Sequence, residues 1–287
     1  MQKKILTVVG TRPNFIKITQ FEKEFAKYPD EFEFKLLHTG QHYDKAMSKV
    51  FFEQLKLREP DYYLGIGAGD PGAQMGQIMI KLTEVMKEWR PDLIVVVGDV
   101  NSTLAAALAA NKMHIKIAHL ESGLRSLDHS MPEEINRLLT DRITDLYFVT
   151  EQSGIDNLKA DGQPDEKVHF VGNTMIDTLV GFSKDIEAAP ILEDLGVKAG
   201  EYALLTMHRP RNVDNAASLK KMIQMITMVG QRFTVVFPVH PRTRKRLETF
   251  GLIEEFNAIP NMIQSGPMDY LSFQKLVPGK VISPILK

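Results

Sequence analysis

Short apolar runs typical of β-strands alternate with helix-like segments along most of the chain. Two of the strand-like runs are ILTVV at residues 5–9 and LIVVV at residues 93–97. The second is apolar throughout, as expected for a strand that is covered on both faces. Between the first two runs the apolar residues recur with helical spacing, on a stripe of Phe15, Ile18, Phe21 and Phe25. This alternation predicts an α/β protein built on doubly wound parallel sheets.

The alternation is interrupted once and then restarts, which predicts two domains. Residues 185–200 contain Pro190 and two glycines, and strand-like runs resume after them. A length of 287 residues is also about right for two domains. We therefore expect a Rossmann-like domain at residues 1–172 and a second one at residues 173–287. Only about three strands are visible in the second, so we expect that domain to be incomplete.

Composition excludes several classes of function. The chain has 35 Lys and Arg residues against 36 Asp and Glu residues, so its charge does not suggest a nucleic acid or an anionic membrane as partner. It contains no cysteine and no metal-ligand motif, which argues against disulfides and thiolate metal sites. No apolar run approaches a membrane span, and the N-terminal run is too short for a signal peptide. We expect a soluble, cytoplasmic protein.

Charged and polar residues directly follow six of the strand-like runs. In an open parallel sheet the carboxyl ends of the strands share one edge, and ligands bind in the crevice there. The residues are Gly10, Arg12 and Lys17; His38, Gln41 and His42; Asp99; Glu121 and Arg125; His208 and Arg209; and His240 and Arg242. This placement predicts one large polar site, with basic groups for an anion and carboxylates for proton chemistry.

The carboxylates also have structural interpretations. Asp99 follows the most apolar strand, where an unpaired carboxylate is costly, but it could instead cap the next helix. Glu121 and Arg125 could form an ion pair within their loop. Glu133 stands three residues after Ser130, which is the spacing of a helix capping box, so its assignment to the site depends on its place at the same sheet edge. His119, taken alone, is interpreted as a hydrogen-bonded core residue.

Basic residues are expected to bind an anion at two places. Arg12 and Lys17 lie at a strand–turn–helix junction whose helix N-terminus presents free N–H groups, although an ordinary turn with solvated side chains would look the same. Arg242 is the first of four basic residues at 242–246, where cations oppose the helix dipole and a bound phosphate would relieve the conflict. The GAGDPG run at residues 67–72 matches a dinucleotide-binding pattern, but it does not follow the first strong strand, so we interpret it as a loop.

These motifs together resemble those of the non-hydrolysing UDP-N-acetylglucosamine 2-epimerases. The similar segments occur in the family's order, and they are GTRPNFIK, HTGQHYD, GDVNSTLA, HLESGLRS, MPEEINR, GNTMIDTL, TMHRPRNVDN and FPVHPRTRKRL. The resemblance implies two Rossmann-like domains of the glycosyltransferase-B type. It also implies that the C-terminal domain binds the nucleotide, that a UDP-sugar lies in the interdomain cleft, and that the protein is a homodimer.

The resemblance further implies a reaction and its residues. UDP-N-acetylglucosamine would be converted to UDP-N-acetylmannosamine by elimination of UDP, through a bound 2-acetamidoglucal, and re-addition. The residues that match catalytic positions are Asp99, Glu121, Glu133 and His208. The residues assigned to substrate binding are Arg12, Lys17, His42, Arg125, Arg209, His240 and Arg242. No cofactor and no metal is implied.

The chain also departs from the family pattern, and this leaves alternatives open. A glycine- and glutamate-bearing TDSGG…QEE segment of the family has no counterpart, and Arg211 stands where many relatives have glutamate. The alternatives are a glycosyltransferase-B-type UDP-sugar enzyme, such as a glycosyltransferase or hydrolase, and a non-catalytic remnant that binds nucleotide.

Overall fold

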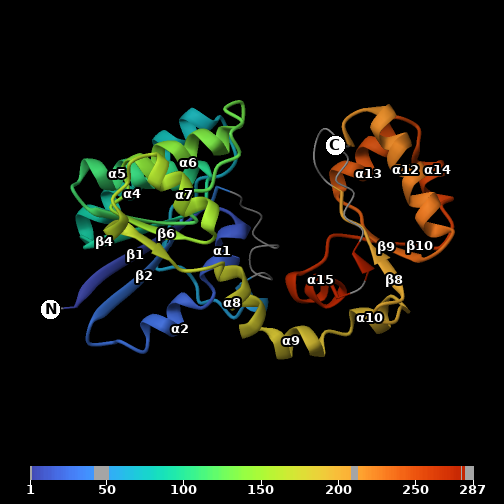
Figure 1. Cartoon of the computed structure of the whole chain (residues 1–287), viewed down its shortest axis with the longest axis horizontal. Helices are drawn as coiled ribbons and strands as arrows, with labels where there is room; N and C mark the ends of the chain where they lie inside the picture. Colours follow the sequence, from blue (N-terminus) through green and yellow to red (C-terminus); the bar gives the residue numbers. More distant parts are fainter. Residues whose placement is uncertain (1, 42–51, 208–212, 279, 282–287) are drawn as a thin grey trace. The chain divides into compact units, whose positions relative to one another are not determined.

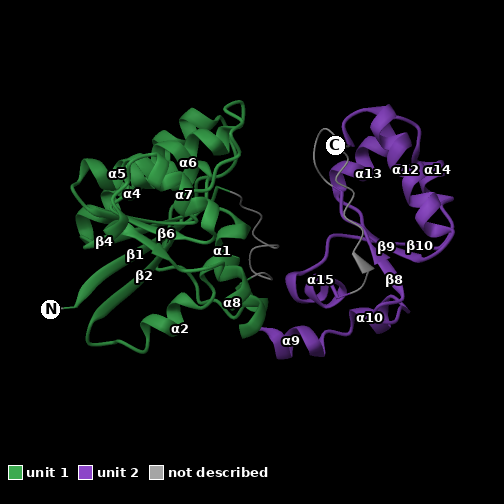
Figure 2. Ribbon diagram, in the orientation of Figure 1, with its two compact units in different colours: residues 1–181 green, residues 182–287 purple. Residues whose placement is uncertain are grey.

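The computed structural model describes residues 2–41, 52–207, 213–278 and 280–281. The chain forms two compact units, unit 1 at Met1–Gly181 and unit 2 at Phe182–Lys287 (Figures 1 and 2). Each unit is an α/β fold around its own sheet, and every strand pair in the described residues is parallel. The α/β class and the two parallel sheets expected from the sequence are confirmed.

Unit 1 contains a seven-stranded sheet with the order β3-β2-β1-β4-β5-β6-β7. The strands are β1 (Lys3–Val9), β2 (Phe32–His38), β3 (Tyr62–Tyr63), β4 (Leu93–Val97), β5 (Lys116–Leu120), β6 (Leu146–Val149) and β7 (Val168–Phe170). The chain builds outward from β1 to β3 and then returns to β4, on the other side of β1. The sheet therefore reverses its order between β1 and β4, and a ligand crevice is expected at the carboxyl ends of these two strands.

Helices cover both faces of the unit 1 sheet, which explains the apolar strands. They are α1 (Arg12–Ile18), α2 (Phe21–Phe25), α4 (Pro71–Glu88), α5 (Asn101–Lys112), α6 (Pro132–Arg142), α7 (Gln152–Ala160) and α8 (Thr174–Gly181), with the short 3₁₀ turn η1 (Asp165–Lys167). In β4, Ile94 and Val96 pack against α4 and α5, whereas Val95 and Val97 point to the opposite face, toward α1 and α2. Successive side chains of a strand point to opposite faces of the sheet, and both faces are covered by apolar side chains, so every residue of the strand is apolar.

The segment expected to be one helix after β1 forms two. The helix α1 ends at Ile18, and α2 begins at Phe21 after a turn. The GAGDPG run is the loop that starts α4, whose N-cap is Asp70; the Asp70 side chain accepts a hydrogen bond from the Ala73 amide at 3.1 Å. The Asp92 carboxylate, directly before β4, accepts the Lys4 amide at 2.8 Å and so joins β1 to the start of β4.

Unit 2 has a four-stranded sheet with the order β10-β9-β8-β11. Its elements are α9 (Ser183–Ala188), α10 (Ile191–Asp194), β8 (Tyr202–Leu204), α12 (Ala216–Gly230), β9 (Thr234–Pro238), α13 (Pro241–Thr249), α14 (Ile253–Asn257), β10 (Met262–Ser265), α15 (Tyr270–Leu276) and β11 (Lys280–Val281). The sequence showed only about three strands in this part of the chain, and the structure adds a fourth, β11, which pairs with β8. Backbone pairing thus adds a strand that side-chain pattern alone did not predict.

The units divide after Gly181, whereas the sequence suggested a boundary after Gly172. The intervening helix α8 packs on α1. The buried Thr178 hydroxyl lies 2.5 Å from that of Thr19 and also hydrogen-bonds to the Ile16 carbonyl. These contacts hold α8 in unit 1. No helix in the described residues is long and apolar enough to cross a membrane.

Candidate functional site

The carboxyl end of β4 presents Asp99 to the neighbouring helix α6. The Asp99 carboxylate forms an ion pair with Arg137, and the Asn136 amide donates to the Asp99 carbonyl at 2.9 Å. The N-cap residue of α5 is Val100, and no side chain caps this helix end. The Asp99 side chain therefore does not cap α5. It is paired with a cation and is 26% exposed.

The end of β5 presents Glu121 to the helix that follows β1. The Glu121 carboxylate pairs with Lys17, and the side chains are only 15% and 11% exposed. The alternative ion pair, between Glu121 and Arg125, is not the one that forms. Gly98 lies between these groups: a Cβ added there would be 3.3 Å from Lys17 Nζ and 3.5 Å from Glu121 Oε2. Three strand ends, those of β1, β4 and β5, thus bring Lys17, Asp99 and Glu121 to one edge of the sheet.

The Glu121 backbone is itself unusual. Its φ of 70° lies in the left-handed region, which residues with a Cβ adopt rarely. Its amide donates to the Phe148 carbonyl at 3.0 Å, so the neighbouring strand β6 holds this conformation in place. Such backbone strain tends to be retained where a side chain must be aimed.

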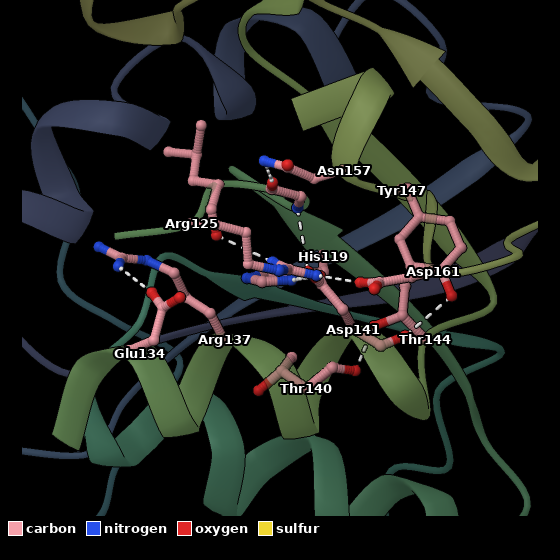
Figure 3. A network of polar contacts seen from close by, with 12 residues as sticks. His119, Arg125, Glu134, Arg137, Thr140, Asp141, Thr144, Tyr147, Asn157 and Asp161 are labelled. Carbon is pink, nitrogen blue, oxygen red and sulfur yellow. Dashed lines mark hydrogen bonds and ion pairs between the residues drawn. The ribbon is translucent and has the colours of Figure 1, made fainter. Parts of the chain in front are cut away.

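Arg125, expected to contact a substrate, lies within a polar network (Figure 3). Its guanidinium donates to Asp141 Oδ2 at 2.7 Å and to Asp161 Oδ2 at 2.8 Å, and its side chain is 6% exposed. Asp141 also receives a hydrogen bond from the His119 ring at 2.7 Å. Burial acts to raise the pKa of the Asp141 carboxyl, but the hydrogen bond from His119 and the charge of Arg125 outweigh it and lower that pKa. As expected, His119 is a hydrogen-bonded core histidine.

The two glutamates at the start of α6 have different environments. Glu133 is exposed, and its carboxylate has no hydrogen-bond partner in the described part of the chain. The expected capping box is not formed, because the N-cap residue is Met131 and the Ser130 hydroxyl donates instead to Asp128 at 2.6 Å. The helix start is held by Glu134, a residue that the sequence did not single out.

Glu134 organises the loop before α6. Its buried carboxylate accepts hydrogen bonds from the Ser126 amide at 2.8 Å, the Ser126 hydroxyl at 3.0 Å and the Leu127 amide at 3.0 Å. Arg137 donates to it at 3.2 Å and so connects it to Asp99. Burial acts to raise the pKa of Glu134, but these hydrogen bonds prevail and lower it. Glu134 is therefore an ionised anchor, and Glu133 remains open to solvent.

The turn between β1 and α1 is held by an amide that the sequence analysis also missed. Asn14 Oδ1 accepts the Gly10 and Thr11 amides, each at 3.1 Å, and Asn14 Nδ2 donates to the Val97 carbonyl at 3.1 Å. This joins the end of β1 to the end of β4. Arg12 is half-buried, and it has no ion-pair partner within the described residues. The signal that could have revealed Asn14 is a polar side chain on the stripe of α1 that faces the sheet.

A second polar cluster lies between the end of β2 and the start of α5. Gln41 Oε1 accepts the Ser102 amide at 3.1 Å and the Ser102 hydroxyl at 2.6 Å, and the Thr39 and Ser102 hydroxyls lie 2.8 Å apart. A Cβ added to Gly10 would lie 2.2 Å from Ser102 Oγ, so only glycine lets these elements approach so closely.

In unit 2, the start of α13 carries His240 and Arg242. His240 is the N-cap residue, and its Nδ1 accepts the Arg242 amide at 3.1 Å. Arg242 donates to both oxygens of Asp214, and Arg246 lies 3.4 Å from the same carboxylate. This carboxylate, which the sequence analysis did not single out, relieves the conflict between the cations and the helix dipole. A hollow lined by Pro241, Arg242, Lys245 and Arg246 lies beside it.

Three of the expected site residues, His42, His208 and Arg209, lie outside the described residues. The described ones fall into two groups. Unit 1 brings together Lys17, Asp99 and Glu121, with Glu133 on the adjoining helix, and unit 2 presents His240 and Arg242 at one helix start. Among described residues, no group of three or more His, Asp or Glu side chains is arranged to hold a metal ion.

The comparison with protein families decides the assignment. The model of the family described as UDP-N-acetylglucosamine 2-epimerase matches residues 23–279 of this chain. The chain belongs to this family. Among curated family members, a protein of Methanococcus maripaludis named as a UDP-N-acetylglucosamine 2-epimerase homolog is 43% identical over 93% of this chain and 74% of its own length. A Pseudomonas aeruginosa relative, named as a UDP-2,3-diacetamido-2,3-dideoxy-D-glucuronate 2-epimerase, is 40% identical over 89% of this chain and 72% of its own.

Solved structures of family members have the same fold. The UDP-N-acetylglucosamine 2-epimerase of Methanocaldococcus jannaschii, solved in complex with UDP-N-acetylglucosamine and UDP, matches with a TM-score of 0.85 and 36% identity, over 98% of this chain and 78% of that protein. The Neisseria meningitidis enzyme bound to UDP-N-acetylglucosamine matches with a TM-score of 0.85 and 28% identity, over 98% and 77% of the two chains. This chain thus has the glycosyltransferase-B-type fold of the epimerases and spans about three quarters of their length.

Proposed function

We propose that this protein inverts the configuration at sugar carbon 2 of a UDP-linked 2-acetamido sugar, interconverting UDP-N-acetylglucosamine and UDP-N-acetylmannosamine. The proposal rests above all on two ionisable carboxylates, Asp99 and Glu121, at the ends of neighbouring strands, each paired with a cation. Family membership supports the same reaction, because the relatives of Methanococcus maripaludis and Methanocaldococcus jannaschii that are named as this epimerase are 40% and 37% identical to the chain.

The reaction requires acid–base groups near one carbon and cations near the diphosphate. A base removes the proton from carbon 2 while the bond between carbon 1 and the UDP oxygen breaks, and the electron pair of that bond leaves with UDP. UDP then adds back to carbon 1 of the bound 2-acetamidoglucal, and a proton returns to carbon 2 from the opposite face. Proton transfer on two faces of one ring needs more than one group, and we assign it to Asp99, Glu121, Glu133 and His208.

Cations stabilise the departing UDP. Fixed positive groups are most effective where negative charge develops in a site from which water is excluded. We assign this role to Arg12, Lys17 and His42 together with Arg209, His240 and Arg242 of the second, nucleotide-binding domain. Arg125 is assigned an indirect part in substrate binding, through the loop that it stabilises, because its guanidinium is already paired with Asp141 and Asp161. The reaction as drawn needs neither a metal nor a redox cofactor.

The relative of Pseudomonas aeruginosa supports a second candidate substrate. Its name describes inversion at the same carbon of a UDP-sugar that also carries an acetamido group at carbon 3 and a carboxylate. The two substrates share UDP and the 2-acetamido group, so the same proton chemistry serves both. We therefore propose UDP-N-acetylglucosamine as the substrate and test the diacetamido-glucuronate alongside it.

Incubation in deuterium oxide tests the proposal. An epimerase exchanges solvent deuterium into carbon 2 and leaves the UDP-sugar intact as a mixture of two epimers, which nuclear magnetic resonance and mass spectrometry detect. A hydrolase or glycosyltransferase would instead release UDP and a free or transferred sugar, and a nucleotide-binding remnant would bind UDP without turnover. Either result, with both substrates supplied, refutes the proposal. We also propose a homodimer that acts in the cytoplasm, and sedimentation of the purified protein tests the dimer.

A further inference from the structure

His119 connects the catalytic edge of the sheet to its interior. Its ring is fully buried on β5, two residues before Glu121. Nε2 lies 2.8 Å from the carbonyl oxygen of Gly98, which directly precedes Asp99, and Nδ1 lies 2.7 Å from Asp141 Oδ1 on α6. One side chain is therefore bonded to the end of β4 and to the helix beyond β5.

The second oxygen of Asp141 holds the other loop of the site. Asp141 Oδ2 accepts the Gly123 amide at 3.0 Å and Arg125 Nη1 at 2.7 Å (Figure 3). These residues belong to the loop that carries Glu121. The buried Asp141 carboxylate is therefore hydrogen-bonded directly to the loop that carries Glu121, and it is connected to the end of β4 through His119.

The loops that follow β4 and β5 contain residues with unusual backbone conformations, which the hydrogen bonds of His119 and Asp141 help to hold. Gly98, Glu121 and Gly123 have φ angles of 68°, 70° and 78°, all in the left-handed region. Regular strand pairing ends here: Gly98 donates to the Leu120 carbonyl, and Glu121 and Ser122 both donate to that of Phe148. Beyond that point side-chain contacts join the two loops, and those of His119 and Asp141 are among them.

We propose that the buried His119–Asp141 pair is a positioning device that fixes the Asp99 carboxylate relative to the Glu121 carboxylate. Neither residue reaches solvent enough to touch a sugar, so both act through the loops that they hold. The catalytic consequence rests on the proposed function, whereas the structural consequence does not. A displacement of about 1 Å of a reacting group can cost about a hundredfold in rate, so loosening this tie should lower kcat and leave substrate affinity nearly unchanged.

Two substitutions of the same residue separate the two bonds of His119. In His119→Gln the side-chain amide nitrogen takes the place of Nε2 and can still donate to the Gly98 carbonyl. In His119→Asn the side chain is shorter, so its amide nitrogen takes the place of Nδ1 and can donate to Asp141, but the hydrogen bond to the Gly98 carbonyl is lost. Each variant keeps one of the two bonds and so breaks the link between Gly98 and Asp141, and we expect both to lose about a hundredfold in kcat with an unchanged KM. Thermal unfolding of both variants checks that they remain folded.

A matched control removes a neighbouring buried hydrogen bond and leaves the side-chain hydrogen bonds of His119 and Asp141 intact. The Tyr147 hydroxyl donates to the Asp141 backbone carbonyl at 2.8 Å, and Tyr147→Phe deletes only this bond. Its kcat should stay at the wild-type level even if its melting temperature falls. Asp141→Asn, which disturbs both loops, should lose at least as much kcat as His119→Asn.

Hydrogen–deuterium exchange tests the tie independently of activity. The amides at residues 98–101 should exchange faster in His119→Asn, His119→Gln and Asp141→Asn than in wild type or Tyr147→Phe. A wild-type protein that epimerises neither substrate refutes the proposed function, and the exchange rates still decide the tie. The inference is overturned by unchanged exchange in His119→Asn, by wild-type kcat in either His119 variant, by a rise in KM that accounts for their loss, or by an equal loss in Tyr147→Phe.

Discussion

Acidification should destabilise unit 1 through the buried imidazole of His38 at the end of β2. The ring is 3% exposed and lies edge-on to Phe15, with the ring centroids 4.9 Å apart, and 5.4 Å from the Tyr63 ring. Burial lowers the pKa of His38 from 6.5 to about 4, and a hydrogen bond with the Gly10 backbone only partly opposes this effect. The folded protein therefore resists a protonation that the unfolded chain accepts readily.

Above pH 6.5 neither state carries a proton on His38, so its full contribution to stability is present. As the pH falls from 6.5 to about 4, the unfolded chain binds the proton and the folded protein does not, so this stability is lost. A pKa difference of this size corresponds to about 3 kcal/mol in the free energy of unfolding. Of this, about 2 kcal/mol should disappear between roughly pH 7 and pH 5, where few carboxylates titrate.

Urea unfolding followed by tryptophan fluorescence measures this effect in unit 1, since Trp89 is the only tryptophan of the chain and is 8% exposed. We expect wild type to lose about 2 kcal/mol more than His38→Phe between about pH 7 and pH 5. The phenylalanine ring keeps the aromatic contacts and cannot titrate. The lost Gly10 hydrogen bond lowers the variant's stability equally at each pH, so only the pH dependence is compared.

The exposed His169 on β7 provides the control. His169→Gln should keep the wild-type pH dependence, because that ring meets solvent in both the folded and the unfolded state. Equal pH dependence in wild type and His38→Phe would refute the argument, since it would mean that burial does not resist protonation of His38.

Three further predictions concern neighbouring or paired residues. Glu134→Gln should lower the free energy of unfolding by about 1.5–3 kcal/mol, because its charge-assisted hydrogen bonds are weakened. The adjacent Glu133→Gln should leave the stability of the protein unchanged and lower turnover at least about tenfold. Denaturant titration and steady-state kinetics compare the two variants, and the reverse pattern would contradict their assigned roles. Asp99→Asn should reduce kcat by about two to four powers of ten with little change in melting temperature, and full turnover would remove Asp99 from the mechanism. Thr178→Val, which removes the hydrogen bonds of Thr178 to the Thr19 hydroxyl and the Ile16 carbonyl, should destabilise α8 by about 1–3 kcal/mol. Faster amide exchange in α8 would show this effect, and unchanged exchange would show that other contacts hold α8.

The fold class and the placement of Asp99 and Glu121 at one edge of the sheet followed from local sequence. Apolar runs such as LIVVV predict strands covered on both faces, and parallel strands place their carboxyl ends on one edge. Asp99 and Glu121 could therefore be assigned to one edge before any contact was known. This works because strand periodicity and strand direction are properties of short segments.

The partners of these residues could not be predicted in the same way. Glu121 pairs with Lys17, 104 positions earlier, and not with Arg125 in its own loop. Asp99 pairs with Arg137, and Asp214 neutralises Arg242 and Arg246. Glu134, not its neighbour Glu133, holds the loop before α6. Each choice is made between groups of similar chemistry, so the sequence alone offers several equivalent pairings.

The unit boundary shows the same division. The boundary expected after residue 172 assigned residues 174–181 to the second domain, whereas the burial of Thr178 against Thr19 holds them in unit 1. The sequence by itself determined most of the strand and helix segments, though not the break between α1 and α2 or the strand β11, and it determined which polar residues stand at strand ends. Only the tertiary structure decided which charges meet and where one unit stops, because those outcomes depend on distances of a few ångströms between segments that are far apart along the chain.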